Sequence, residues 1–295
     1  MAGKTDVFDR EFLSNLQRLT IATKKPFRGA MKGEKRSPKR GTAIEFADYR
    51  EYVAGDDFRY IDWTLYSRLN RLYLKLFEEE EDLFVYVLLD ASESMGFGDP
   101  RKFECGLRLA AAFAYIALSS LNRVQVSVFS DRLGARFGPK RGKGSIFQLF
   151  EFLARLEPAG RSGLDRAVKE FSLTTTRTGV VILLSDFLFP GGYADALAPI
   201  VGRGFDVGCV QILDQSEVDP GLEGDLVLLD SETGEEREIT ISPASVRRYR
   251  DDLSAYNEGL REWCFARRAN YMLATTDIDF RDLVMRYLRI QGFVT

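Results

Sequence analysis

The sequence predicts an α/β fold: a doubly wound, mainly parallel sheet with helices on both faces, preceded by an N-terminal extension of one helix and short strands. Two observations lead to this class. Short, uniformly apolar runs, typical of strands buried on both faces, alternate with helical patterns from residue 84 to residue 288. Oxygen-bearing side chains follow two of these runs, at strand ends where open α/β sheets bind ligands. With 295 residues and 45% hydrophobic content, the chain can bury a large core.

The N-terminal part predicts a helix, a basic loop and short strands. Phe8 to Thr20 places its apolar residues at helical spacing. Lys24 to Arg40 holds eight Lys or Arg residues against one Glu, and it fits either a basic loop or a docking site for an acidic partner or polyanion. From Gly41 to Glu80, aromatic and charged residues alternate around a turn at residues 55–57, which indicates short, half-buried strands.

The sheet-forming part starts with the apolar strand Phe84 to Leu89. A long helix from Lys102 to Leu121 follows, whose small residues suit close packing on a sheet, and then the strand Val124 to Phe129. The later elements are expected in this order: a short edge strand at Gly134–Phe137, a helix at Ser145–Leu156, a strand at Val180–Leu184, a helix near Tyr193–Val201, a strand at Phe205–Ile212, a hairpin of Leu226–Leu229 and Arg237–Ile241, a long helix within Ser245–Arg268, a strand at Tyr271–Ala274 and a terminal helix at Phe280–Leu288.

Composition excludes several kinds of active site. The chain has no histidine, so Ser-His-Asp and Cys-His catalytic groups and His-ligated zinc are not possible. Its three cysteines lie far apart in apolar surroundings, which predicts buried thiols and a reducing compartment. The N-terminus has no signal-peptide pattern, and the longest apolar segment, Leu109 to Leu121, is shorter than the roughly 20 residues that cross a bilayer. We therefore expect a cytoplasmic protein, and the net charge of −3 gives no overall attraction to nucleic acid or membrane.

A set of hard oxygen ligands follows the first apolar strand. Asp90, Ser92 and Ser94 occupy alternate positions, so their side chains can meet one small cation from one side. The same residues also fit a turn that caps the next helix. The D-x-S-x-S pattern resembles the metal-ion-dependent adhesion site of von Willebrand factor A-type domains.

This resemblance implies two further ligands. Sites of that family take a third hydroxyl from a loop before a helix, and an Asp from the end of the next strand. Ser162 in AGRSGLDRAV and Asp186 in VVILLSDF stand at these places. Ser in place of the usual Thr keeps the oxygen and loses a methyl group. The resemblance implies Mg²⁺, with Mn²⁺ or Ca²⁺ as alternatives, and an open coordination position that takes a carboxylate from a partner protein.

A second resemblance covers nearly the whole chain. The order EF-x-DYREY-x-x-GDD-x-R-x-IDW-x-x-x-x-R, shortly before D-x-S-x-S, resembles the bacterial family named domain of unknown function 58, whose members join such a segment to a von Willebrand factor A-like domain. Genes of this family commonly accompany MoxR-type AAA+ ATPases, which implies such an ATPase as the partner. The residues that carry the resemblance are Glu45, Phe46, Tyr49, Arg50, Tyr52, Gly55, Asp56, Arg59, Ile61, Asp62, Trp63 and Arg68, then Asp90, Ser92, Ser94 and Met95.

Some residues of this N-terminal segment are candidates for contact with the partner. Because charged side chains beside a Trp need internal partners when they are partly buried, the alternative is a structural network of ion pairs and turn hydrogen bonds. The candidates are Arg50, Asp56, Arg59, Asp62, Trp63 and Arg68.

We expect two parts in the chain. Residues 1–80 form the N-terminal family segment, and they should pack on the core because no Pro/Gly/Ser-rich linker separates them from the first core strand. Residues 81–295 form the von Willebrand factor A-like domain, of Rossmann type, with a hairpin insertion near residues 225–242.

The function expected from the sequence is that of a non-enzymatic interaction module, an adaptor that binds a MoxR-type ATPase through the metal ion. No catalytic residue is predicted. The stretch GPKRGKGS at residues 138–145 is one residue short of a phosphate loop, and we expect a basic surface turn there. Two alternatives stay open: a metal-dependent phosphoesterase that uses Asp90 and Asp186, and nucleic-acid or polyanion binding through residues 24–40.

Overall fold

The computed structural model describes residues 9–24, 44–79, 83–222, 224–229 and 236–295. The chain divides into two compact units: one joins Met1–Pro26 to Leu83–Thr295 and contains the main sheet, and the other is Phe27–Asp82. Residues 9–24 therefore belong with the sheet, whereas we expected them in one segment with the residues up to 80. The packing of the N-terminal segment on the core stays a prediction, and so does the role of the basic segment, because residues 25–40 lie outside the described residues.

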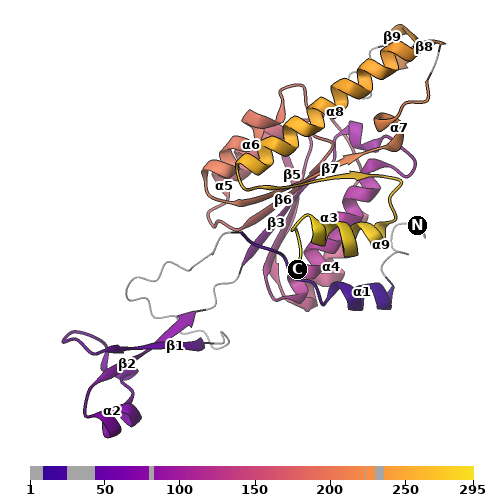
Figure 1. The fold of residues 1–295 in the computed structure, drawn as a ribbon. Coiled ribbons are helices and arrows are strands. Elements are labelled where there is room, and N and C mark those ends of the chain that lie inside the picture. Colours follow the sequence, from indigo (N-terminus) through magenta and orange to yellow (C-terminus); the bar gives the residue numbers. More distant parts are fainter. Residues whose placement is uncertain (1–8, 25–43, 80–82, 223, 230–235) are drawn as a thin grey trace. The chain divides into compact units, whose positions relative to one another are not determined.

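The sheet unit is built on six strands in the order β10-β7-β6-β3-β4-β5 (Figure 1). Neighbouring strands pair in parallel, except that β5 pairs antiparallel with β4. The residues of β6 and β7 are buried throughout, as expected for strands covered on both faces. The predicted doubly wound, mainly parallel sheet is confirmed. Its strands are β3 (Phe84–Asp90), β4 (Arg123–Phe129), β5 (Leu133–Arg141), β6 (Val180–Ser185), β7 (Asp206–Leu213) and β10 (Asn270–Thr275).

The strand order reverses between β3 and β6. The chain passes from β3 outward to β4 and β5, and then returns to place β6 on the other side of β3. Leu89 of β3 lies opposite Leu184 of β6, so the two strands end at the same level. Open α/β sheets bind ligands outside the carboxyl ends of their strands at such a reversal. The loops that follow Asp90 and Ser185 therefore lie where a binding site is expected.

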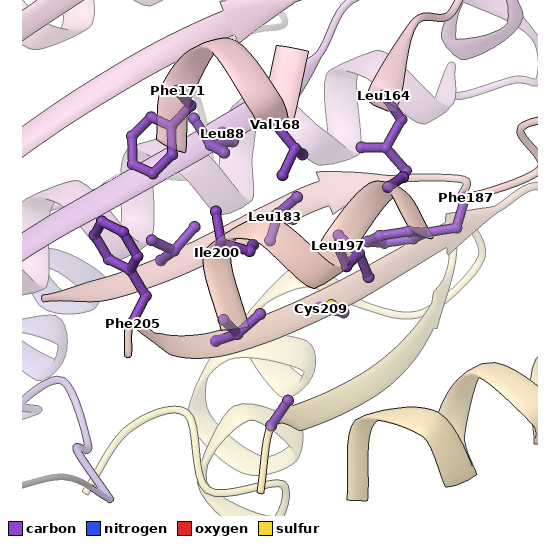
Figure 2. Close-up of a cluster of buried hydrophobic side chains, with 14 of the residues drawn as sticks. Leu88, Leu164, Val168, Phe171, Leu183, Phe187, Leu197, Ile200, Phe205 and Cys209 are labelled. Carbon is purple, nitrogen blue, oxygen red and sulfur yellow. The ribbon is translucent and has the colours of Figure 1, made fainter. Parts of the chain in front are cut away.

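Helices α5 (Leu164–Thr174), α6 (Tyr193–Gly202) and α8 (Pro243–Ala266) cover one face of the sheet. Their apolar sides meet the strands in one cluster of buried side chains, which Figure 2 shows. Removing each large apolar side chain from water stabilises the fold by about 1.5–3 kcal/mol. Labelled members of the cluster are Leu88, Leu164, Val168, Phe171, Leu183, Phe187, Leu197, Ile200, Phe205 and Cys209.

Helix α3 (Lys102–Ser119) covers the opposite face, and its small residues allow the close packing that the sequence predicts. A Cβ atom on Gly106 would lie 2.9 Å from Leu89 Cδ1, so the helix backbone approaches β3 directly. The other helices of this layer are α1 (Arg10–Leu16), α4 (Ile146–Ala154) and the C-terminal stretch of α9 (Phe280–Asp282), a π-helical turn η4 (Leu283–Tyr287) and α10 (Leu288–Ile290).

The N-terminal and C-terminal residues of the sheet unit pair with each other. Thr20 N–H donates to the Thr295 carbonyl (3.1 Å), and Thr295 N–H donates to the Thr20 carbonyl (2.9 Å). Ile21 and Val294 form an antiparallel bridge between these two bonds. Helix α1 is further tied to the C-terminal stretch by an edge-on contact of Phe12 with Phe280. Residues before and after the small unit therefore complete one fold together.

The predicted hairpin insertion is present as the antiparallel pair β8 (Gly224–Leu229) and β9 (Glu236–Ile241). The basic turn expected at residues 138–145 is wrong in its first half, because Gly138 to Arg141 belongs to β5. Pro139 is tolerated there since β5 is an edge strand, and its pairing with β4 shifts register beside the proline. A 3-10 helix, η3 (Lys143–Ser145), follows.

The second unit contains two strands, β1 (Ile44–Glu51) and β2 (Tyr73–Glu79), which pair antiparallel. Short strands were expected in this segment, but directly around the turn at residues 55–57, and β2 begins much later. The connection between them holds a 3-10 helix, η1 (Phe58–Tyr60), and a short helix, α2 (Trp63–Leu69), that the sequence analysis did not predict. Asp62 caps α2 by accepting hydrogen bonds from the N–H groups of the second and third helical residues.

Candidate functional site

The D-x-S-x-S loop brings its three predicted ligands together at the end of β3. Asp90 Oδ1 accepts hydrogen bonds from the Ser92 N–H (2.9 Å) and the Ser92 hydroxyl (2.7 Å). The hydroxyl oxygens of Ser92 and Ser94 lie 3.0 Å apart. The chain can make this tight turn because a 3-10 helix, η2 (Glu93–Gly96), begins directly after Ser92. One carboxylate oxygen and two hydroxyl oxygens therefore form a compact group.

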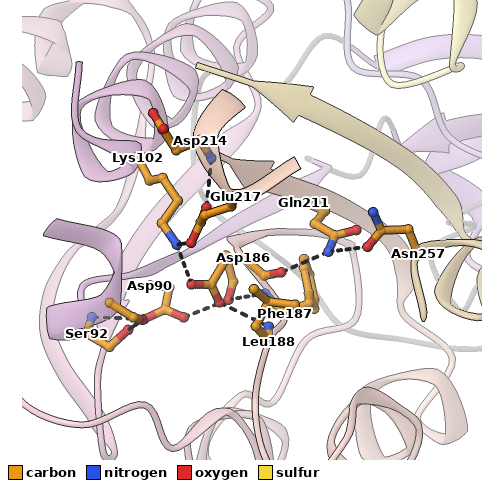
Figure 3. A network of polar contacts seen from close by, with 12 residues as sticks. Asp90, Ser92, Lys102, Asp186, Phe187, Leu188, Gln211, Asp214, Glu217 and Asn257 are labelled. Carbon is orange, nitrogen blue, oxygen red and sulfur yellow. Dashed lines mark hydrogen bonds and ion pairs between the residues drawn. The ribbon is translucent and has the colours of Figure 1, made fainter. Parts of the chain in front are cut away.

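Asp90 is fully buried, and the hydrogen-bond donors around it in the described part of the chain are uncharged (Figure 3). Its second oxygen accepts a hydrogen bond of 2.6 Å from the Ser185 hydroxyl, at the end of the neighbouring strand β6. Burial raises the pKa of Asp90 to about 6, the charge of Asp186 adds to the rise, and the hydrogen bonds from Ser185 and Ser92 oppose it. The site thus holds a carboxylate whose negative charge is poorly compensated.

Asp186 lies in the loop after β6 and is paired with a lysine. Lys102 Nζ, in the first turn of α3, donates to Asp186 Oδ2 at 2.9 Å, and Asp186 Oδ1 accepts the Leu188 N–H at 3.1 Å. The Lys102 side chain is 1% exposed. Burial alone would lower the pKa of Lys102, but the nearby charges of Asp186 and Glu217 outweigh burial and raise it. Lys102 is therefore a buried cation beside the candidate site.

Lys102 also contacts Glu217, which lies just after a third strand, β7. Lys102 Nζ lies 2.7 Å from Glu217 Oε1, and the other oxygen of Glu217 accepts the Asp214 N–H at 2.8 Å. Glu217 belongs to the short helix α7 (Gln215–Val218), whose capping residue is Asp214, directly after β7. Asp214 also accepts a hydrogen bond of 2.7 Å from Thr276, beyond the end of β10. The network thus connects loops that follow β3, β6, β7 and β10.

The loop that carries Ser162 lies beside the D-x-S-x-S loop. Ala159 N–H donates to the Ala91 carbonyl (2.7 Å), and Glu93 N–H donates to the Gly160 carbonyl (2.8 Å). A Cβ atom on Gly163 would collide with the Asp131 backbone, so glycine is required where the Ser162 loop passes Asp131. Ser162 is half-buried within the loop. The three loops named in the sequence analysis therefore meet at the reversal of strand order.

The residue after Asp186 has a strained backbone. Phe187 is fully buried and has φ of +57°, a left-handed conformation that costs a bulky residue about 1–3 kcal/mol. Its N–H donates to Ser185 Oγ (3.0 Å), and its carbonyl accepts the Tyr256 hydroxyl of α8 (2.6 Å). Gln211 of β7 donates to the Asp186 carbonyl (3.0 Å). These bonds hold the Asp186 loop in one conformation.

The residues at the carboxyl end of β3 fit a hard cation. Mg²⁺ prefers oxygen ligands, and Asp90, Ser92 and Ser94 offer them next to an uncompensated, buried carboxylate. Asp186 has both oxygens engaged by Lys102 and Leu188, so it would reach a cation at most indirectly. Among the described residues, no group of three or more Asp, Glu or Cys side chains has an arrangement suited to a metal ion. A cation here would therefore depend on hydroxyl ligands.

The candidate partner-contact residues all lie in the second unit, and the structure assigns several of them to internal contacts. Arg50 pairs with Asp56 (2.7 Å), whereas Arg59 pairs with its neighbour Asp57. Asp62 is buried, caps α2 and accepts the Tyr49 hydroxyl (2.9 Å). Trp63, 61% exposed, and Arg68 lie on the exposed part of α2. The available surface of this set is thus centred on α2.

Three residues of the site, Lys102, Ser185 and Glu217, carry only weak signals in the sequence and were not predicted. Lys102 gave a weak signal, since a basic residue at the first helical position is disfavoured by the helix dipole and needs another reason. Ser185 stands directly before Asp186, at the end of an apolar strand, where a hydroxyl is equally unusual. Glu217 follows Asp214 by three residues, the spacing of a capping box.

The sequence of the chain matches one protein family and several uncharacterized proteins. Residues 48–258 match the family described as "Protein of unknown function DUF58". The chain is 27% identical over 254 residues to the uncharacterized protein Mb1516 of Mycobacterium bovis, covering 84% of this chain and 78% of the relative. The uncharacterized protein Rv1480 of Mycobacterium tuberculosis has the same identity and coverage.

Similar solved structures include the hypothetical protein BatB of Bacteroides thetaiotaomicron, with 14% identity, a TM-score of 0.41, and coverage of 71% of this chain and 98% of that one. An aerotolerance-related membrane protein of Bacteroides fragilis gives the same values. Likeness at this level carries no information on function. In the part of the chain that the structure describes, every helix is too short or too polar to cross a membrane.

Proposed function

Because the chain belongs to the DUF58 family, we propose that it is a non-enzymatic interaction module that binds a partner protein through a metal ion. The observation that carries the proposal is the compact group of Asp90, Ser92 and Ser94 oxygens at the reversal of strand order. An uncompensated carboxylate in this group is costly to keep buried unless a cation comes to it.

The residues of the site have distinct tasks in this proposal. Asp90 supplies the negative charge, and Ser92 and Ser94 supply neutral oxygens beside it. Ser162 is the further hydroxyl, brought near by the bonds between the two loops. Bound Mg²⁺, or Mn²⁺ or Ca²⁺, would supply an open coordination position that accepts a carboxylate of the partner. The fixed loop at Asp186 keeps the site in shape, so little ordering is needed when the partner binds.

The partner that we propose is a MoxR-type AAA+ ATPase with an exposed Asp or Glu side chain. This choice rests on the resemblance of the sequence to a family whose genes accompany such ATPases. Trp63 and Arg68, exposed on α2, are proposed as a second contact region because aromatic and Arg side chains provide much of the binding energy at protein interfaces. The chain would then act as an adaptor for the ATPase.

Capture of the purified MoxR-type ATPase from the same genome tests the proposal. We expect binding in Mg²⁺, loss of binding in EDTA, and loss in Asp90→Ala and Ser94→Ala even with Mg²⁺ present. Asp195→Ala, which changes an exposed residue of α6, and Ser145→Ala, which changes a half-buried residue of η3, are the matched controls and should bind as the wild type does. Equal capture by wild type and Asp90→Ala would show that the metal does not bridge the two proteins.

The phosphoesterase alternative stays a prediction, and so do polyanion binding by residues 24–40 and a cytoplasmic location. The same variants address the first of these. Turnover of p-nitrophenyl phosphate that is lost in Asp90→Ala and kept in Asp195→Ala would favour the enzyme. A salt-sensitive shift of a labelled oligonucleotide would favour polyanion binding.

A further inference from the structure

Lys102 is a buried charged group that the proposed function does not use. Its side chain is 1% exposed, although an ammonium group is costly to remove from water and is disfavoured in the first turn of a helix. Two carboxylates hold it, Asp186 at 2.9 Å and Glu217 at 2.7 Å (Figure 3). These two carboxylates hold the lysine in an otherwise unfavourable place, and the lysine in turn compensates part of their charge.

The two aspartates of the site differ in their charge balance. Asp186 faces the Lys102 ammonium with one oxygen and a backbone N–H with the other, so both oxygens are engaged and its charge is partly compensated. Asp90 accepts hydrogen bonds from two hydroxyls and one backbone N–H, all uncharged. Of these two aspartates, Asp90 is therefore the one whose negative charge has no cationic partner among the described residues.

We propose that Lys102 is a specificity-determining residue of the metal site, which withholds Asp186 from the ion and leaves Asp90 as the one carboxylate that binds it. This inference rests on the proposed function and adds to it. An ion held by one carboxylate and neutral hydroxyls keeps most of its positive charge, so it binds weakly alone and attracts a further carboxylate strongly. Lys102 thus lowers the affinity of the site for free Mg²⁺ and raises the affinity of the bound ion for a carboxylate of the partner.

Glu217 limits this effect, because it shares the ammonium. One oxygen of Glu217 contacts the Lys102 ammonium, and its second oxygen accepts the Asp214 N–H, which fixes the Glu217 side chain. Removing the charge of Asp186 would leave Lys102 with Glu217 as its counter-ion. Asp186→Asn should for that reason fold even if a variant of Lys102 does not.

Titration calorimetry of the full chain with MgCl₂ tests the inference. Lys102→Met frees Asp186 to approach the ion, and we expect its Mg²⁺ affinity to rise by roughly tenfold or more over the wild type, whereas Lys102→Arg keeps the charge and should stay near the wild type. A merely structural lysine would not raise affinity when removed. Asp186→Asn should lose less than roughly tenfold in affinity, against roughly 100-fold for Asp90→Asn.

Two results would overturn the inference: a folded Lys102→Met that binds Mg²⁺ no more tightly than the wild type, or Asp186→Asn that loses as much affinity as Asp90→Asn. If Asp186→Asn loses less affinity than Asp90→Asn, this difference supports the inference even when Lys102→Met fails to fold. Binding by Lys102→Met but not by the wild type would support the inference and remove the metal bridge from the proposed function. If wild type and folded Lys102→Met both fail to bind, the inference and the metal bridge are both wrong.

Discussion

Lys102 Nζ lies 2.9 Å from Asp186 Oδ2, so the first turn of α3 is bonded to the loop after β6. Removing one member of a buried ion pair leaves the other charge unpaired in a poorly solvated place, which costs about 3–5 kcal/mol. We therefore expect Lys102→Met to lower the free energy of unfolding by that amount in EDTA, measured by urea titration at pH 7. The loss should be smaller in Mg²⁺, because the ion supplies positive charge to the freed Asp186.

Glu217→Gln is the control for this variant. It keeps the contact of Lys102 with Asp186 and should cost less than Lys102→Met. A Lys102→Met protein as stable as the wild type in EDTA would show that the ion pair has no net effect on stability.

Asp90→Asn should stabilise the protein when no metal is present. The pKa of Asp90 is raised from 3.8 to about 6, roughly two units, and each unit is worth about 1.4 kcal/mol. Because the folded-state pKa lies above the unfolded one, the wild type loses stability as pH rises through about 6, whereas Asn cannot ionise. At pH 7 in EDTA we expect Asp90→Asn to gain up to about 3 kcal/mol, and near pH 4 little difference.

Addition of Mg²⁺ should remove most of this difference between the two proteins. A concentration of about 100 times the wild-type dissociation constant adds about 2.7 kcal/mol to the wild type, but only about 0.4 kcal/mol to Asp90→Asn if that variant binds about 100-fold more weakly. Asp195→Asn, on the exposed side of α6, should respond to Mg²⁺ as the wild type does. A Mg²⁺-dependent rise in the melting temperature of Asp90→Asn as large as that of the wild type would contradict the assignment of Asp90 as the main ligand.

Tyr256→Phe should weaken the Asp186 loop in a pH-dependent way. The Tyr256 hydroxyl donates to the carbonyl of the strained Phe187, and leaving that carbonyl without its donor should cost about 1–3 kcal/mol at pH 7. Burial and the charges of Tyr193 and Asp186 raise the pKa of Tyr256 to about 12. The bond therefore contributes fully below about pH 10, and its contribution is lost as pH rises through about 12.

Urea unfolding of wild type and Tyr256→Phe at pH 7, 9 and 11 checks this prediction. The difference between the two proteins should be constant up to pH 9 and smaller at pH 11. Tyr60→Phe, which changes a half-exposed tyrosine of the second unit, is the matched control. A difference that grows with pH would contradict the assigned direction.

Asp62→Ala should loosen the second unit without touching the sheet. Asp62 caps α2 and accepts the Tyr49 hydroxyl, and loss of a helix cap costs about 0.5–2 kcal/mol. We expect faster hydrogen exchange in residues 63–69 and unchanged exchange in β3 and β6. Trp63→Ala removes an exposed side chain and should leave both regions unchanged while it weakens capture of the ATPase. Faster exchange in Trp63→Ala would make Trp63 a structural residue instead.

The sheet could be predicted from the sequence because its strands carry a local signal. The strands β3, β6 and β7 are buried on both faces and are therefore mostly apolar. Helix α2 was missed because its aromatic and charged residues also fit an alternating strand, and only the cap at Asp62 separates the two. The end of β5 was misjudged at Pro139, since a sequence does not tell an edge strand from a turn.

The residues of the candidate site also differ in whether the sequence predicts that they lie together. Asp90, Ser92 and Ser94 belong to one loop, so their spacing already places them together. Lys102 and Asp186 are 84 positions apart, and Lys102 and Glu217 are 115 positions apart. Contacts over such separations depend on strand order, which leaves no pattern in neighbouring residues. The pairing of Lys102 with Asp186 and Glu217 could therefore be found only in the three-dimensional structure.

The pairing of residues 20–22 with residues 293–295 sets an order for folding on the ribosome. Thr20 and Thr295 are 275 positions apart, so the first described segment of the sheet unit waits for its partner until 275 further residues have been synthesised. Until then the apolar face of α1, including Phe12 and Leu16, has no complete surface to pack on. A chain that stalls before residue 293 is thus left with exposed apolar residues on α1, which makes it a target for chaperones and proteases.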